Sequence, residues 1–347
     1  MSIPFSILDL APIVTGSTSA QALRNTFDLA QHADRLGYTR YWLAEHHGMP
    51  GIASSAPAVL IAELAAATSR LRIGSGGVML PNHSPLVVAE QFGMLEALHP
   101  GRIDLGVGRN AGIDPRIEEA LQLSAGTQSI EDFTKRLVEL RNYFSEDSLA
   151  IPAAGNRPPM WLLGSSVRSA KMAGLFGLPF AFAHHLNDQQ TVQALDTYRE
   201  AFQPSIELDR PYALITVPII CADTDARAQK LAEPGALAFI ELQKLGAGQS
   251  PRSQLPTMDE VENYPYSAPE REIVNAYFES QIIGGQETVR AKLDDLIQRT
   301  QVDEIMATGM VYHHKDLLRS YELLAGLYAD GACVWTRAPE RTDIDGY

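Results

Sequence analysis

The amino-acid sequence predicts an α/β fold in which eight strand–helix pairs form a (β/α)8 barrel, or TIM barrel. Short apolar runs alternate with longer segments whose apolar residues recur at helical spacing, and eight such pairs follow one another. This alternation requires parallel strands, because each helix must cross back over the sheet before the next strand begins. The length of 347 residues suits either two domains or one barrel with insertions.

The first half of the chain contains four of the expected pairs. Glycine or proline stands where helices are expected to end, as at Gly37 and Pro100. The strands are expected at residues 6–10, 40–44, 71–80 and 103–107. The helices are expected at residues 23–37, 57–68, 86–98 and 130–144.

The second half repeats the pattern four times. The strands are expected at residues 160–163, 180–183, 212–221 and 304–308, and the helices near residues 165, 188–202, 224 and 317–324. Between the last two strands, residues 246–271 are rich in glycine and proline, and we expect an insertion without regular structure near the barrel mouth. We therefore predict one barrel domain over residues 1–328, followed by a C-terminal tail over residues 329–347.

The composition is that of an acidic globular protein. Hydrophobic residues make up 45% of the chain, and 28 Lys and Arg against 42 Asp and Glu give a formal net charge of −14. This charge disfavours nucleic acid and anionic membranes as partners, and no apolar run is long enough to cross a bilayer. The two cysteines, Cys221 and Cys333, have no metal or redox spacing. Since the first residues also lack a signal-peptide pattern, we expect a cytoplasmic protein.

The chemistry of such a barrel is expected at the carboxyl ends of the strands. Glu45-His46-His47 follows the second strand, where these groups could serve acid–base chemistry or bind a metal ion. Adjacent residues at a strand end point apart, so a metal would need further ligands. The candidates are His83, His184, His185, His313 and His314. A solvated loop that merely contains two histidines would explain the same residues without a function.

Three other strand ends are rich in glycine or serine. The third strand contains Gly74-Ser75-Gly76-Gly77, which indicates either close strand packing or a flat ligand against the backbone. The fourth ends in Gly106-Val107-Gly108-Arg109-Asn110, which is not a dinucleotide fingerprint but could bind an anion or a polar ring edge. Gly164-Ser165-Ser166 opens a helix whose N–H groups could bind phosphate, although serine N-caps are common without a ligand. Together these segments favour a cofactor that carries phosphate.

These segments resemble those of the bacterial luciferase-like flavin monooxygenases. The similarity extends from about Phe5 to Leu327 and keeps the order of the family's strand ends. The motifs are YWLAEHHG (41–48), IGSGGVMLPNHSPLVVAEQ (73–91), GRIDLGVGRNAG (101–112), WLLGSSVRSAKMAGLFGLPFAFAHH (161–185) and EIMATGMVYHHKDLLRSYELLA (304–325). The resemblance implies a (β/α)8 barrel with an insertion before the last strand.

The resemblance also implies roles for individual residues. His46 matches a histidine that acts as an acid–base group beside the flavin, and Gly76-Gly77 matches a pair whose peptide bond is cis in luciferases and packs under the flavin ring. Gly164-Ser165-Ser166 matches the phosphate-binding turn, where luciferases have an additional acidic residue that this sequence lacks. The further cofactor-binding residues implied by these motifs are Glu45, Val78, Arg109 and Asn110.

The activity implied by the resemblance is that of a two-component monooxygenase. Reduced FMN from a separate NAD(P)H:flavin reductase would react with O2 to give a C4a-peroxyflavin, which would insert one oxygen atom into a small organic substrate. Tyr41, Trp42 and Phe182 near the strand ends favour an apolar substrate, and luciferases imply a homodimer. The alternatives are hydride transfer with the deazaflavin F420, flavin binding without catalysis, and a metal-dependent hydrolase.

Overall fold

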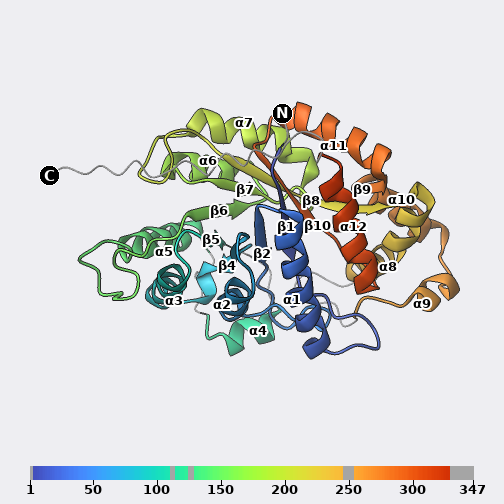
Figure 1. The fold of residues 1–347 in the computed structure, drawn as a ribbon, viewed down its shortest axis with the longest axis horizontal. Helices are drawn as coiled ribbons and strands as arrows, with labels where there is room; N and C mark the ends of the chain where they lie inside the picture. Colours follow the sequence, from blue (N-terminus) through green and yellow to red (C-terminus); the bar gives the residue numbers. More distant parts are fainter. Residues whose placement is uncertain (1–2, 110–113, 124–128, 245–253, 329–347) are drawn as a thin grey trace.

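The computed structural model describes residues 3–109, 114–123, 129–244 and 254–328, and it confirms the predicted barrel (Figure 1). Eight parallel strands pair in the order β10-β1-β2-β3-β5-β6-β7-β8, and β8 pairs with β10 to close the cylinder. Their bounds are β1 (Phe5–Asp9), β2 (Arg40–Leu43), β3 (Arg72–Ser75), β5 (Ile103–Gly108), β6 (Met160–Gly164), β7 (Phe180–Phe182), β8 (Ala213–Ala222) and β10 (Glu304–Thr308).

Helices cover the outside of the barrel (Figure 1). Several begin at a side-chain cap, as where the Thr18 and Ser129 hydroxyls accept N–H groups of the first turn. Their bounds are α1 (Ser19–Leu36), α2 (Pro57–Ala67), α3 (Pro85–Leu98), α4 (Pro115–Ala120), α5 (Ile130–Asn142), α6 (Val167–Phe176), α7 (Thr191–Ala201), α8 (Asp225–Gln243), α11 (Gln286–Thr300) and α12 (His314–Gly326), with short 3₁₀ turns at Leu80–Asn82 and Asp188–Gln190. Within the described residues, no helix has the length and apolar character needed to span a membrane.

Side chains of each strand alternate between the barrel interior and the layer under the helices. Tyr41 and Leu43 belong to the large core between strands and helices. Trp42 belongs to the smaller core inside the barrel, where it packs edge to face against Trp161 with ring centroids 5.1 Å apart. Met306 completes this layer, so apolar side chains fill the middle of the barrel.

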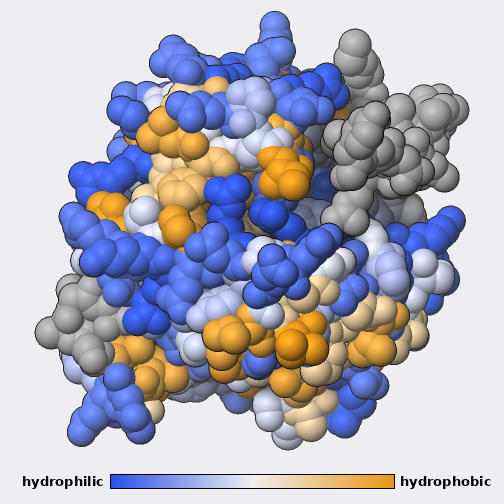
Figure 2. Space-filling model, turned by 90° about the vertical axis from the view of Figure 1, so that its left-hand side faces the viewer, coloured by the Kyte–Doolittle hydropathy of each residue, from blue (hydrophilic) through white to orange (hydrophobic). Residues whose placement is uncertain are grey.

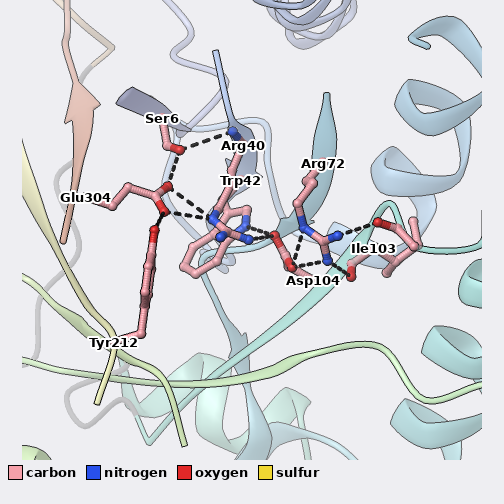
Figure 3. A network of polar contacts seen from close by, with 9 residues as sticks. Ser6, Arg40, Trp42, Arg72, Ile103, Asp104, Tyr212 and Glu304 are labelled. Atoms are coloured by element: carbon pink, nitrogen blue, oxygen red, sulfur yellow. Dashed lines mark hydrogen bonds and ion pairs between the residues drawn. The ribbon is translucent and has the colours of Figure 1, made fainter. Parts of the chain in front are cut away.

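Charged side chains fill the amino-terminal end of the barrel interior (Figure 3). The buried Arg40 guanidinium lies 2.9 Å from an oxygen of Asp104 and 3.0 Å from an oxygen of Glu304. Arg72 binds the other oxygen of Asp104 at 2.6 Å, and the Tyr212 hydroxyl donates to Glu304 at 2.8 Å. Burial opposes ionisation of Asp104, but Arg72 and Arg40 lower its pKa to about 2. The buried charges are therefore paired, as a stable interior requires.

The strand expected over residues 71–80 is interrupted. Its two halves are β3 and β4 (Val78–Met79), and the peptide bond between Gly76 and Gly77 is cis, as in the luciferases that the sequence resembles. The neighbouring strand passes very close here, because a Cβ on Gly77 would lie 2.8 Å from the carbonyl oxygen of Gly106. Strand packing therefore accounts for part of the glycine content.

The expectation that residues 246–271 lack regular structure is wrong for the described part. Two helices, α9 (Met258–Asn263) and α10 (Ala268–Glu279), begin there, and each starts with a reciprocal capping box. Residues 246–253 and the tail at 329–347 lie outside the described residues. After α10, β9 (Ile282–Gly285) pairs with the outer end of β8 and extends the sheet beyond the barrel.

Candidate active site

The carboxyl ends of the barrel strands surround a cavity of about 550 Å³. Most of the residues predicted for the site line it, although they come from distant parts of the chain. These lining residues are Glu45, His46, Gly76, Arg109, Gly164, Ser165 and Ser166. Gly77 and Val78 are buried and are not among the lining residues. Asn110 lies outside the described residues.

Glu45 is a buried carboxylate that organises the loops after β2 and β3. Its Oε1 accepts hydrogen bonds from Nε2 of His47 at 2.9 Å and from Nε2 of His83 at 2.8 Å. Its Oε2 accepts from the backbone N–H of Met79 at 3.0 Å. Burial alone would raise the pKa of Glu45, but these donors outweigh it and lower the pKa to about 2. Glu45 is therefore ionised and fully engaged by the protein, which indicates a positioning residue.

His46 is the histidine of this motif that lines the cavity. Its backbone N–H donates to the Ser54 carbonyl at 2.9 Å, which anchors the loop. Burial lowers the pKa of His46 more than the nearby Glu45 charge raises it, so the ring is neutral at pH 7. The buried Nδ1 has no hydrogen-bond partner among the described residues. Because a buried N–H without an acceptor is costly, the proton is expected on Nε2.

The Glu45 cluster makes folding pH-dependent in a defined direction. Glu45 titrates at about 2 in the folded protein against an ordinary value of 4.5, so its contribution to stability is complete above pH 4.5 and is lost as the pH falls toward 2. We expect E45Q to lose about 3 kcal/mol of this contribution near neutral pH. Urea unfolding of parent and E45Q would show their difference shrinking as the pH falls from about 6 to about 3. A difference that stays constant over this range would contradict the assignment.

Gly164-Ser165-Ser166 connects β6 directly to the start of α6. The Ser166 hydroxyl accepts from the Ser169 N–H at 3.3 Å, and the Ser169 hydroxyl donates to the Ser166 carbonyl at 2.7 Å. A Cβ on Gly164 would lie 2.1 Å from the Ser169 hydroxyl, so the turn requires glycine. The cap engages two of the serines, and an anion would bind to the N–H groups at the helix start together with Ser165.

Arg168 also lines the cavity, in the first turn of α6. It is exposed there and adds a cation beside the N–H groups of the helix start. The sequence reasoning did not single it out, although an arginine two residues after a serine N-cap is a visible signal. Arg109 lies at the end of β5 and lines the same cavity. Two arginines and one helix start therefore supply positive potential that the net charge of the chain does not.

His185 and Thr216 also line the cavity and were not predicted as cofactor or catalytic residues. His185 was considered only as a metal ligand. The expectation that Tyr41 and Phe182 contribute to the mouth is wrong, because both are fully buried in the core under the helices. Trp42 lines the floor of the cavity as expected. Tyr41 and Trp42 differ in this respect because side chains alternate along a strand: Trp42 faces the barrel interior and Tyr41 faces the helices.

The histidine-rich loops do not assemble into a ligand set for a metal ion in the parts of the chain that the structure describes. His47 and His83 both direct Nε2 to Glu45, and His184 directs Nδ1 to the Thr191 hydroxyl at 2.7 Å. The histidines that reach the cavity, His46 and His185, approach from opposite sides. The geometry therefore offers acid–base and hydrogen-bonding groups around an organic ligand.

Comparison with known proteins identifies the family. Residues 3–304 match the family model of the luciferase-like monooxygenases. The chain is 44% identical over 327 residues to the luciferase-like monooxygenase of Escherichia coli (strain K12), a match that covers 93% of this chain and 96% of that protein.

Solved structures agree with this match. The crystal structure of apo-MsnO8 superimposes with a TM-score of 0.84 at 37% identity and covers 94% of this chain and 98% of that chain. The oxygenating constituent of 3,6-diketocamphane monooxygenase from Pseudomonas putida, in complex with FMN, shares the fold with a TM-score of 0.71 at 18% identity, over 95% and 99% of the two chains. The barrel, the cavity at its carboxyl end and these matches show that the chain belongs to the luciferase-like monooxygenase family of oxidoreductases.

Proposed function

We propose that the protein is an FMN-dependent monooxygenase that takes reduced FMN from a separate NAD(P)H:flavin reductase and transfers one atom of O2 to a small organic substrate. The observation that carries the proposal is the continuity of one cavity from the anion-binding start of α6, past Gly76, to His46. The FMN complex of the 3,6-diketocamphane monooxygenase constituent, which has the same fold, supports the choice of cofactor. Residues 1–328 would form a single functional domain.

The residues present fit a phosphorylated flavin. The start of α6, with Ser165 and Arg168, would hold a phosphate, since backbone N–H groups and a guanidinium are both anion donors. Gly76 presents backbone without a Cβ to the cavity, as a flat ring requires. His46 would present Nε2 to the ligand, because its Nδ1 is buried and its side chain lines the cavity. Glu45 would act by positioning His47 and the Met79 backbone.

Reduced FMN, when bound, would supply the electrons with which O2 is activated for transfer of one oxygen atom. The chain itself would bind, shield and exchange protons. Its apolar walls, which include Leu8, Leu163 and Met306, would exclude water from the reacting atoms. His46, neutral at rest at pH 7, would take up a proton and deliver it from Nε2 to a developing oxygen anion, which returns the ring to its neutral form.

The direct test is a titration of the purified protein with FMN and, separately, with F420, followed by O2 consumption with FMN and a generic flavin reductase. Product formation and peroxide release would be measured across a panel of neutral organic substrates. FMN binding with substrate-dependent product supports the proposal. Tight F420 binding without FMN binding would favour F420-dependent hydride transfer instead, and FMN binding without oxygenation would favour a non-catalytic flavin protein.

The phosphate assignment leads to a prediction for Arg168. We expect R168A to weaken FMN binding about three- to tenfold and to leave riboflavin binding unchanged, because riboflavin lacks the phosphate and Arg168 is partly screened by solvent. Flavin fluorescence titrations would measure both affinities. R319A, which removes an arginine from a surface ion pair with Asp223, is the matched control. Equal weakening of FMN and riboflavin by R168A would contradict the assignment.

A homodimer is part of the proposal, and the outer faces of α2 and α3 offer the surface. Large apolar side chains are exposed there, among them Val59 (70%), Met94 (51%) and Leu98 (67%). Hydrophobic side chains gather across the lower part of the face that α3 borders (Figure 2). Apolar surface of this kind is typical of subunit contacts.

We expect the double variant M94E/L98E to be monomeric at micromolar concentration, because a new buried charge on each subunit would face the partner's apolar surface. Light scattering coupled to size exclusion would show the mass falling by half relative to the parent. The control is I206E, since Ile206 is 86% exposed and lies far from these helices in sequence. A parent protein that is itself monomeric would contradict the dimer.

A further inference from the structure

We propose that His185 orients the substrate by accepting a hydrogen bond from a hydroxyl, or another uncharged donor group, on an otherwise apolar molecule. The proposal rests on the monooxygenase function proposed above and names the substrate class of the same cavity. It assigns a specificity role to a residue on the wall that faces His46.

The closed barrel places the two cavity histidines on opposite sides. His46 follows β2 and His185 follows β7, and these strands lie four positions apart in the ring of eight. Both side chains line the cavity. They are near enough for a charge on His46 to disfavour a charge on His185. A ligand can therefore contact both rings from within one cavity.

The hydrogen bonds of His185 determine which of its nitrogens carries the proton. The Thr216 carbonyl accepts the backbone N–H of His185 at 3.1 Å and lies 3.3 Å from its Nδ1. A carbonyl has no proton to give, so Nδ1 is the donor and Nε2 of the neutral ring is an acceptor. Nε2 makes no hydrogen bond within the described part of the chain, and the ring stays accessible where it borders the cavity.

The neutral form of His185 is the relevant one at pH 7. Although the ring is open to the cavity, loss of hydration among the surrounding protein atoms lowers its pKa to about 4, and the neighbouring rings of His184 and His46 act in the same direction. The two cavity histidines therefore have opposite hydrogen-bonding roles. His46 would present an N–H to the cavity, whereas His185 would present a lone pair.

The rest of this wall is apolar. It comes from the ends of β7, β8, β10 and β1, and its described lining residues include Ala183, Leu186, Met306, Leu8 and Leu10. Beside His185, Thr216 is the polar residue of this wall, and no charged side chain from these four strands is among the described lining residues. A carboxylate or ammonium group would thus lose its hydration here without an ionic partner. An apolar body with a donor group matches this wall and the acceptor on His185.

The experiment compares two ligands that differ only in donor ability. The probes are 4-tert-butylcyclohexanol and 4-tert-butylcyclohexanone, with 4-tert-butylcyclohexanecarboxylate as the charged member. Dissociation constants would be measured by ligand-observed NMR on the protein without flavin and again with oxidised FMN. The variants are H185F, which removes the acceptor, and H185Q, which restores one. H184Q is the matched control, because His184 bonds to the Thr191 hydroxyl and is not a lining residue.

We expect the parent and H184Q to bind the alcohol about tenfold more tightly than the ketone and, with FMN bound at the start of α6, to bind the carboxylate more weakly than either. H185F should lose the preference for the alcohol, and H185Q should recover part of it. A parent that binds neither probe, or that does not prefer the alcohol, would overturn the proposal, as would an H185F variant that keeps the preference. If H185F loses FMN affinity but still prefers the alcohol, the His185 ring contacts the flavin and not the substrate. That result would also overturn the proposal.

The proposed function can fail separately. If the parent shows the alcohol preference without flavin but does not bind FMN, the assignment of His185 stands and the FMN-dependent activity is wrong.

Discussion

H46A is expected to lower coupled oxygenation at least about 100-fold, the size typical of a lost acid–base group, while FMN affinity stays within about threefold of the parent. His46 lines the cavity, is neutral at pH 7 and lacks a partner for its buried Nδ1, so its proton is available at Nε2. Without that proton donor, the reduced flavin should still react with O2 but release peroxide in place of product. Product and peroxide formed per NADH consumed would be measured for the best substrate of the panel.

Two comparisons separate a proton-transfer role from a structural one. H46Q keeps a polar side chain of similar size but cannot exchange a proton near pH 7, so it should be as deficient as H46A. H184Q, with its histidine outside the cavity, should retain the parent's activity. The parent's rate should fall as the pH rises above the lowered pKa of His46, because the protonated ring is the form that can give up a proton. Coupled turnover by H46Q near the parent's rate would exclude His46 as the acid–base group.

R40M is expected to destabilise the fold by about 3 to 5 kcal/mol, the loss typical when one partner of a buried ion pair is removed. Arg40 is paired with Asp104 and Glu304, whose side chains have no exposed surface. Methionine would fill much of the space but leave Glu304 without a cation and Asp104 with Arg72 alone (Figure 3). The Arg40 guanidinium also lies over the Trp161 ring, 4.7 Å from its centroid, so a contact in the barrel core would be lost as well.

The free energy of unfolding in urea would measure this loss. R319M breaks the surface ion pair of Arg319 with Asp223, in which both side chains are more than half exposed, and it should cost less than about 1 kcal/mol. The double variant R40M/E304Q removes the unpaired charge of Glu304, leaves the Arg72–Asp104 pair intact and should recover part of the stability. An R40M protein within about 1 kcal/mol of the parent would mean that water or remaining donors compensate both carboxylates.

The positions of most elements could be predicted from local patterns. Strand alternation and helical spacing depend on neighbouring residues, and the observed bounds of β5 and α2 differ from the expected ones by one residue. The helices at Met258 and Ala268 were missed because proline and glycine dominated the interpretation of residues 246–271. A local signal was available there, since Thr257–Glu260 and Ser267–Glu270 both have the spacing of a capping box.

The site was predictable in part for a related reason. Parallel strands bring their carboxyl ends to one face, so Glu45, His46 and Gly164 were expected together and line one cavity. Arg168, His185 and Thr216 were missed, because nothing local distinguishes a residue that faces the cavity from its neighbour that does not. His184 and His185 are adjacent in sequence, yet only His185 lines the cavity.

By itself, the sequence determined the eight-fold alternation, the parallel barrel and the strand ends on which chemistry is placed, because periodicity and chain topology leave few other arrangements. Only the tertiary structure decided which histidine nitrogens have partners, which of Tyr41 and Trp42 faces the cavity, and how Arg40 joins Asp104 and Glu304 across the barrel. These features depend on closure of the barrel, which brings Arg40 and Glu304, 264 positions apart in the chain, within hydrogen-bonding distance. Hydrogen bonds and ion pairs act over a few ångströms, so the chemistry of the site is set only when the barrel closes.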